Sequence, residues 1–287
     1  MIQSARIGYS WRRRLSRGAI HLLLILGAVV VLFPLFWMLN TSLKPLPQTR
    51  AYPPVFIPHP FVWRNYIDAL TLLPFQIFFR NTLIISIAVI IGELLSSSFV
   101  AYGFARLSFP GRDILFLLLV STMIIPFIVR LVPLFLIFKK LGWINTFLPL
   151  IVPSYFGTAF FIFLMRQFYL TIPEDLLDAA RVDGANEFTI WWRVMVPLSK
   201  PALMVVAVLA FQHTWNDFLA PLIYLNDTDK FTAALGLVSM LSQSGASTEY
   251  WNYLMAVATT MVAPLLVLYV IGQRYLVQGI VLTGIKG

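Results

Sequence analysis

PEDLLDAARVDGANEFTIWWRVMVPLSKP, from Pro173 to Pro201, is the longest stretch of this sequence that is not apolar. It carries five of the twelve acidic residues of the chain, namely Glu174, Asp175, Asp178, Asp183 and Glu187. Hydrophobic segments flank it on both sides. We take residues 171–200, which lie between the two flanking hydrophobic segments, as one loop and call it the polar loop. We expect a loop of this size in an apolar chain to be recognised by a partner.

The composition indicates a membrane protein. Of 287 residues, 59% are hydrophobic and 11% are charged, whereas soluble domains carry about 25% charged residues. No polar segment is long enough to bury a core of its own, so we predict no soluble catalytic domain. The net charge of +9 fits the excess of basic residues on the cytoplasmic side of membrane proteins, and we expect no nucleic acid partner. With no cysteine, the chain has no disulfide or thiolate site.

Six apolar stretches are long enough to cross a bilayer, which takes about 20 residues. They are Ile20–Asn40, Ile77–Phe99, Ile114–Arg130, Phe147–Tyr169, Leu203–Tyr224 and Tyr253–Tyr275. We therefore predict an all-α polytopic membrane protein with six transmembrane helices. We expect Pro126 and Pro133 to interrupt the third span, with a separate interfacial helix over Leu134–Leu141.

Basic residues orient the spans. A cluster directly precedes the first span and places the N-terminus in the cytoplasm: Arg6, Arg12, Arg13, Arg14 and Arg17. Six spans then place both termini in the cytoplasm. The expected divisions are a basic N-terminus (1–19), a transmembrane domain (20–276) that contains the polar loop, and a C-terminal tail (277–287). The polar loop and a hairpin over Phe104–Asp113 are then cytoplasmic.

Local signals predict two short helices in the polar loop. Pro173 suits the first position of a helix, and Gly184 suits the left-handed residue that ends one. Asn186 is typical of the residue that caps the start of a second helix, which would run through Trp191 and end at Pro197.

The same loop carries a spaced motif. Asp178-Ala179-Ala180 is followed after three residues by Gly184, and after nine more by Val194-Met195-Val196-Pro197. This resembles the EAA loop of permeases of ATP-binding-cassette (ABC) importers, with Asp in place of Glu and two valines in place of Ile and Leu. FPGR from Phe109, LGWINT from Leu141, WNDF from Trp215 and the tail from Gly279 extend the resemblance to importers of the maltose type, and within these to the second permease subunit.

The resemblance implies a binding-protein-dependent importer in a bacterial or archaeal plasma membrane, carrying a sugar or a related polyol phosphate. The partners would be a second homologous permease, two ATPase subunits and an extracytoplasmic substrate-binding protein. ATP and magnesium would bind the ATPases, since this chain has no phosphate-binding loop, and we expect no cofactor, metal or catalytic residue here. The residues that would dock on the ATPase are Asp178, Ala179, Ala180, Arg181, Asp183, Gly184, Val194 and Pro197. The alternative for this loop is a solvated connector with an interfacial second helix.

Polar residues within the spans are candidates for the substrate path, because burying them in lipid is unfavourable. They are Glu93, Gln212, Trp215, Asn216 and Asp217. Gln212, Asn216 and Ala220 would share one face of the fifth span. For Glu93 the alternative is helix packing through a hydrogen bond, and for Asn216 and Asp217 it is that they hold the helix bundle together. Used instead as ion sites, Glu93 and Asp217 would make the chain an ion-coupled secondary transporter. The aromatic group of Phe75, Phe78 and Phe79 is expected to face lipid or the membrane interface.

Overall fold

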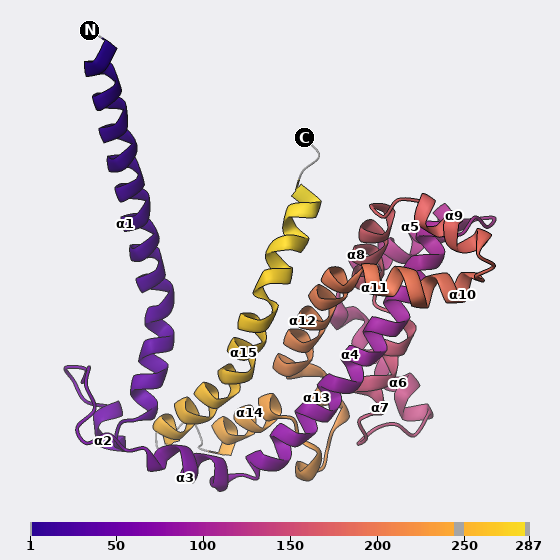
Figure 1. The fold of residues 1–287 in the computed structure, drawn as a ribbon. Coiled ribbons are helices and arrows are strands. Elements are labelled where there is room, and N and C mark those ends of the chain that lie inside the picture. Colours follow the sequence, from indigo (N-terminus) through magenta and orange to yellow (C-terminus); the bar gives the residue numbers. More distant parts are fainter. Residues whose placement is uncertain (1, 244–249, 285–287) are drawn as a thin grey trace. The chain divides into compact units, whose positions relative to one another are not determined.

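The computed structural model describes residues 2–243 and 250–284, which contain helices and no strand (Figure 1). The chain forms two compact units. The first comprises Met1–Leu72 with Gln243–Thr260, and the second comprises Leu73–Ser242 with Met261–Gly287. The all-α prediction is therefore confirmed for the described residues.

The first unit contains α1 (Ile2–Ser42), α2 (Leu46–Thr49), α3 (Arg64–Leu72) and the start of α15 (Trp251–Gly284). Its polar centre lies at the end of α1. The Nδ2 atom of Asn65 donates to the carbonyl oxygens of Ser42 and Lys44, at 2.8 and 2.9 Å. The buried Lys44 ammonium lies over the ring of Trp37, 4.1 Å from its centroid. These contacts provide partners for the polar groups at the end of α1 and just after it.

The second unit is built around α4 (Phe75–Arg106), which packs against α8 (Ala159–Leu170) and α12 (Lys200–Asn216). Around these lie α5 (Arg112–Ser121), a 3-10 turn (Thr122–Ile124), α6 (Phe127–Lys140), α7 (Leu148–Ile151) and a second 3-10 turn (Val152–Phe156). The polar loop forms α9 (Asp175–Val182), α10 (Glu187–Ile190), a π-helical turn (Trp191–Met195) and α11 (Val196–Leu198). After α12 come α13 (Leu219–Tyr224), a 3-10 turn (Thr228–Lys230) and α14 (Ala233–Gln243).

By length and composition the helices provide four membrane crossings, or up to six if each bent pair counts as one span. Four are long, apolar helices: Gly18–Ser42, Phe75–Arg106, Leu148–Leu170 and Trp251–Gln273. Two more are bent pairs, Arg112–Ile124 with Phe127–Lys140 at 102°, and Glu187–Leu198 with Lys200–Asn216 at 79°. The expected N-terminal segment 1–19 is helical from Ile2 and continuous with the first span. Of the expected tail 277–287, residues 285–287 lie outside the described residues.

Proline interrupts the third span at one of the two predicted positions. The third span is interrupted before Pro126 but not at Pro133, which lies inside α6. Pro133 deprives only the Val129 carbonyl of a donor, so the helix continues and no separate helix forms over 134–141. The fifth span, predicted as continuous, breaks at Asp217. Pro221 explains this break, because its ring would clash with the carbonyl four residues earlier.

The aromatic residues at the start of α4 are not placed as expected. Phe75 and Phe78 are fully buried and pack edge to face with ring centroids 5.3 Å apart. Phe78 lies against Gly236 of α14. A Cβ atom added at residue 236 would lie 2.3 Å from the ring of Phe78. The prediction that these residues face lipid or the membrane interface was wrong. The surface of α14 that covers Phe78 lies far along the sequence, so local sequence gives no sign of it.

Candidate functional site

Helix α9 ends in the turn that the sequence predicts. Gly184 has a φ of +82°, a conformation that side chains disfavour. Its N–H donates to the carbonyl of Arg181, and the N–H of Ala185 donates to the carbonyl of Ala180, both at 3.0 Å. This pair of bonds is a Schellman motif, which stops α9 and turns the chain sharply.

The next helix is capped as predicted, by the residue two positions after the glycine. The Oδ1 atom of Asn186 accepts the N–H of Thr189 at 2.8 Å and caps α10. The predicted start of α9 was two residues early, since the helix begins at Asp175 rather than at Pro173. A π-helical turn over Trp191–Met195 widens the second helix, a feature common at functional sites.

One side of the polar loop is anchored in the hydrophobic core. Leu177, Ile190, Trp191 and Met195 are buried and belong to one cluster with residues of α4, α8 and α12. The members from those helices include Ala101, Tyr102, Met165, Tyr169 and Val206. Burying side chains of this size contributes about 2 kcal/mol each, so the loop is packed onto the helices rather than suspended beside them.

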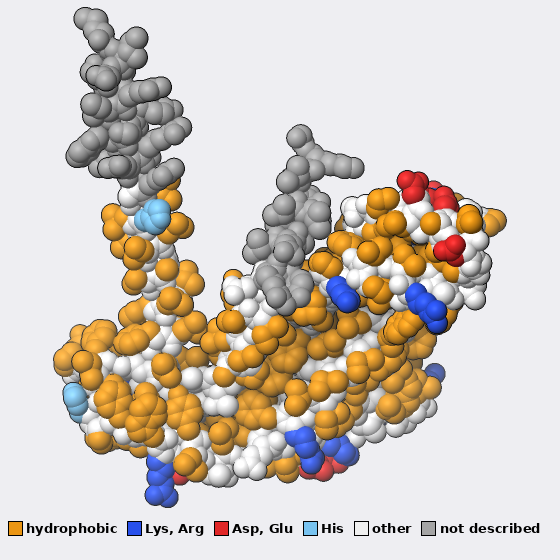
Figure 2. Space-filling model, viewed as in Figure 1, with side chains coloured by type: hydrophobic (Ala, Val, Ile, Leu, Met, Phe, Trp, Pro, Cys, Tyr) orange, Lys and Arg blue, Asp and Glu red, His pale blue; other side chains and the backbone are white. Residues whose placement is uncertain are grey.

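The opposite side of the polar loop is exposed. Val182 is 87% exposed, and Leu176, Phe188 and Trp192 are also exposed. Figure 2 shows acidic side chains gathered over α9 and α10. Of the predicted docking residues, Asp178, Ala179, Asp183, Gly184 and Pro197 are exposed, whereas Ala180, Arg181 and Val194 are half-buried. Five of the eight predicted docking residues are therefore accessible to a partner.

A network of ion pairs joins the two loop helices. The Nε atom of Arg181 donates to Glu187 at 3.1 Å, and its Nη1 atom donates to Asp178 at 2.8 Å and to Glu174 at 3.5 Å. Glu187 also accepts the hydroxyl of Tyr102. Arg106 donates to Glu174 at 2.5 Å. Tyr102 and Arg106 both lie on α4, so the network reaches beyond the loop.

The network shifts the ionisation of its members. Partial burial opposes the charge of Glu187, but the hydrogen bonds from Tyr102 and Arg181 outweigh it and hold the pKa of Glu187 below its usual value. Hydrogen bonds to Glu187 and Asp178 raise the pKa of Arg181. Both groups are therefore charged throughout the physiological range.

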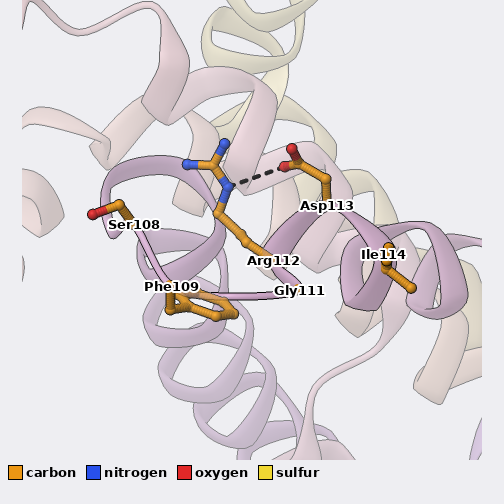
Figure 3. A pocket seen from close by; sticks show the side chains of 6 residues that line it. All are labelled: Ser108, Phe109, Gly111, Arg112, Asp113 and Ile114. Atoms are coloured by element: carbon orange, nitrogen blue, oxygen red, sulfur yellow. Dashed lines mark hydrogen bonds and ion pairs between the residues drawn. The ribbon is translucent and has the colours of Figure 1, made fainter.

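A tight hairpin joins α4 to α5 and is shorter than expected, because α4 continues to Arg106. Gly111 has a φ of +80°, and the Nε atom of Arg112 donates to Asp113 at 3.0 Å. Figure 3 shows this pair beside Ser108, Phe109 and Ile114, around a shallow depression. The Nη1 atom of Arg112 also donates to the Leu107 carbonyl at 3.3 Å, so the arginine closes the turn.

Glu93 is buried where α4 crosses the break in the fourth span. Its carboxylate accepts the backbone N–H of Thr158 at 3.2 Å, the hydroxyl of Thr158 at 2.5 Å and the hydroxyl of Ser97 at 3.1 Å. Thr158 immediately precedes α8, so Glu93 caps that helix from a neighbouring one. These contacts match the helix-packing alternative for Glu93.

The candidates of the fifth span divide into two groups. Trp215 is buried, stacks on Phe211 with centroids 5.0 Å apart, and donates its indole N–H to the Met261 carbonyl at 3.0 Å. Asp217 accepts the N–H of Ala220 at 3.2 Å at the start of α13. Both side chains therefore have structural partners.

Gln212 and Asn216 are exposed, and the Nδ2 atom of Asn216 donates to the Gln212 carbonyl at 2.8 Å. The break after Asn216 removes Ala220 from their face, so the predicted three-residue stripe is wrong. Within the described residues no group of three or more His, Cys, Asp or Glu is placed to hold a metal ion.

Sequence reasoning missed Tyr102, Arg106 and the role of Glu174. The available signal was the four-residue spacing of Tyr102 and Arg106, which puts both on one face at the end of a helix. Their partners, Glu187 and Glu174, lie 85 and 68 residues away, and nothing in the sequence pairs them.

Comparison with known proteins gives one consistent family. Residues 94–282 match the family described as binding-protein-dependent transport system inner membrane component. The chain is 33% identical over 263 residues to the arabinooligosaccharides transport system permease protein AraQ of Halalkalibacterium halodurans, covering 91% of this chain and 93% of that protein. It is 32% identical over 267 residues to the sn-glycerol-3-phosphate transport system permease protein UgpE of Yersinia pestis, covering 91% and 94%.

A solved structure shares the fold. It is the crystal structure of a bacterial ABC transporter involved in the import of the acidic polysaccharide alginate, with a TM-score of 0.81, 24% identity, and coverage of 91% of this chain and 96% of that one. With two thirds of the chain matching the family and relatives similar over nearly their whole length, this chain is a permease of the binding-protein-dependent transport family, an inner membrane component.

Proposed function

We propose that this chain is a transmembrane subunit of an ATP-driven sugar importer and that its polar loop receives movement from a partner ATPase. The observation that carries the proposal is the two-sided character of the loop. One side is anchored in the helix core, and the other presents Val182, 87% exposed, beside a glycine turn. The loop exposes four large apolar side chains, Leu176, Val182, Phe188 and Trp192. Such a number on one anchored loop favours a docking surface over a solvated connector.

The shape of the exposed turn suits a groove. Ala179 and Gly184 add little side-chain bulk, so the backbone can approach a partner closely. The acidic residues Asp175, Asp178 and Asp183 surround them, which favours a partner with basic residues at the rim of its groove. Docking of an apolar centre within a charged rim is the usual arrangement of a protein interface.

The other subunits follow from the family and from the names of the relatives. We propose a second homologous permease beside this one, two ATPase subunits that bind ATP and magnesium, and an extracytoplasmic binding protein that delivers the cargo. In this arrangement the segments 1–19 and 277–287 and the polar loop face the cytoplasm. Family membership argues against the alternative of an ion-coupled secondary transporter using Glu93 and Asp217.

The cargo is proposed from chemistry that the relatives share. Arabinooligosaccharides and sn-glycerol-3-phosphate are both rich in hydroxyl groups, which pair with amide side chains. Gln212 and Asn216 expose such groups in the fifth span, and we propose that they line the path. Glu93, Trp215 and Asp217 then support it structurally. Uptake of labelled arabinotriose and glycerol 3-phosphate by cells that express the whole transporter would separate these cargo classes.

Cross-linking tests the docking directly, because the chain has no cysteine of its own. In membranes that contain the whole transporter, Val182→Cys should cross-link to the ATPase subunit through a short thiol-reactive reagent. Tyr52→Cys, equally exposed but in the α2–α3 connection, is the control and should give no such product. Efficient cross-linking at Tyr52 and none at Val182 would contradict the proposed role of the polar loop.

A further inference from the structure

The end of α4 is bound to the polar loop at two points. Tyr102 and Arg106 are four residues apart in the last turns of this helix, so they lie on the same face about 6 Å from each other. Tyr102 donates its hydroxyl to Glu187, which is the first residue of α10. Arg106 donates through Nη1 to Glu174, which precedes α9. Each residue thus holds the start of a different loop helix.

Both side chains are shielded from water. Tyr102 is buried, and the side chain of Arg106 is 6% exposed. The Nη2 atom of Arg106 also donates to the carbonyl oxygens of Tyr169, in the last turn of α8, and of Ile172, just after that helix. Hydrogen bonds to charged groups that are withdrawn from water are stronger than surface ion pairs. Arg106 therefore fixes three segments together: the ends of α4 and α8 and the start of α9.

The contacts close into a ring. Glu174 accepts Arg106 through Oε2 and Arg181 through Oε1. Glu187 accepts Tyr102 through Oε2 and Arg181 through Oε1. Together with the buried side chains that anchor the loop in the core, these two attachments, joined by Arg181, oppose its rotation. Displacement of the loop must then displace the end of α4 as well.

We infer that Tyr102 and Arg106 are positioning residues that pass movement of the polar loop to α4, the helix around which the second unit is built. The inference rests on the proposed function and goes beyond it, since it names the residues through which the movement enters the membrane helices. Glu93, further along the same helix, binds the start of α8, so displacement of α4 reaches the break in the fourth span.

The test combines two variants with a matched control. Tyr102→Phe removes one hydroxyl and keeps the buried ring. Arg106→Lys keeps the charge but cannot reach Glu174 and two carbonyls at once, because lysine lacks the planar fork of arginine. Tyr224→Phe is the control, since Tyr224 is also buried and its hydroxyl has no hydrogen-bond partner among the described residues.

The first measurement is hydrogen–deuterium exchange of the full chain in lipid nanodiscs. We expect amides of residues 175–190 to exchange about tenfold faster in Tyr102→Phe and Arg106→Lys, with exchange in α12 unchanged and no effect in Tyr224→Phe. Unchanged exchange in 175–190 would overturn the inference. Faster exchange throughout the second unit would overturn it too, because it would mean a general loss of stability.

The second measurement is the ratio of ATP hydrolysed to labelled arabinotriose or glycerol 3-phosphate imported, whichever the wild-type transporter carries, in proteoliposomes. We expect both variants to raise this ratio several-fold, and Glu187→Gln combined with Tyr102→Phe to add little to either change alone. A normal ratio in both variants would overturn the inference while leaving the proposed function standing. Absence of ATP-dependent import by the wild-type transporter would instead contradict the proposed function.

Discussion

At the scale of the residue, the backbone conformation of Gly184 sets the turn that ends α9. A Cβ at this position would meet nothing within 4 Å, yet the φ of +82° is one that side chains avoid. We predict that Gly184→Val costs about 1 to 2 kcal/mol in the turn and raises ATP hydrolysis per molecule transported. Gly184→Asn, which tolerates this conformation, should couple nearly normally. Equal coupling in the valine variant and the wild type would contradict this role for the turn.

Glu93 gives a second prediction at this scale. It accepts two hydrogen bonds from Thr158 and one from Ser97, so Glu93→Ala leaves the start of α8 unpaired. We expect a loss of about 2 kcal/mol, seen as a lower Tm of the purified chain in detergent. Thr158→Val, which keeps the backbone bond, should cause a smaller loss. Abolished uptake with an unchanged Tm would show that Glu93 belongs to the path instead.

At the scale of the element, the polar loop behaves as one piece because Arg181 joins its two helices. The pKa of Glu187 is lowered, so its ion pair stabilises the loop at pH values above the ordinary glutamate pKa of about 4.3. That stabilisation is lost as the pH falls from there through the lowered pKa. We predict that a spin label at Val182→Cys becomes more mobile as the pH falls below the ordinary glutamate range. In Glu187→Gln the label should be mobile at neutral pH already, and an immobile label there would contradict the role of this pair.

The break between α12 and α13 leads to a further prediction. Asp217 accepts the N–H of Ala220 and so caps α13. Loss of such a cap costs about 1 kcal/mol. We expect Asp217→Ala to lower the Tm and leave the affinity for cargo unchanged, whereas Asp217→Asn should restore most of the Tm. A change in cargo affinity without a change in Tm would place Asp217 in the path.

The sequence predicts local features better than distant pairings. The glycine turn and the Asn186 cap were predicted correctly because both depend on the residue's own backbone preference and near neighbours. The burial of Phe78 against Gly236 could not be predicted, since the two lie far apart in sequence. The break at Asp217 could have been predicted from Pro221, four residues later. The apolar character of the stretch favoured one continuous span instead.

At the scale of the whole molecule, the membrane helices and the family match describe a permease, and we propose that its polar loop receives movement from a partner. The sequence has no phosphate-binding loop, so we propose that a partner subunit supplies the energy. The proposal of an ATPase partner therefore depends on coupling between subunits rather than on any catalytic group in this chain.

One measurement tests that claim most directly: uptake of labelled cargo into proteoliposomes that contain the complete transporter and its binding protein, with ATP on the ATPase side and no ion gradient. The account predicts uptake that requires ATP, survives ionophores and falls in Gly184→Val while ATP hydrolysis continues. Uptake that follows an imposed proton or sodium gradient and ignores ATP would contradict it.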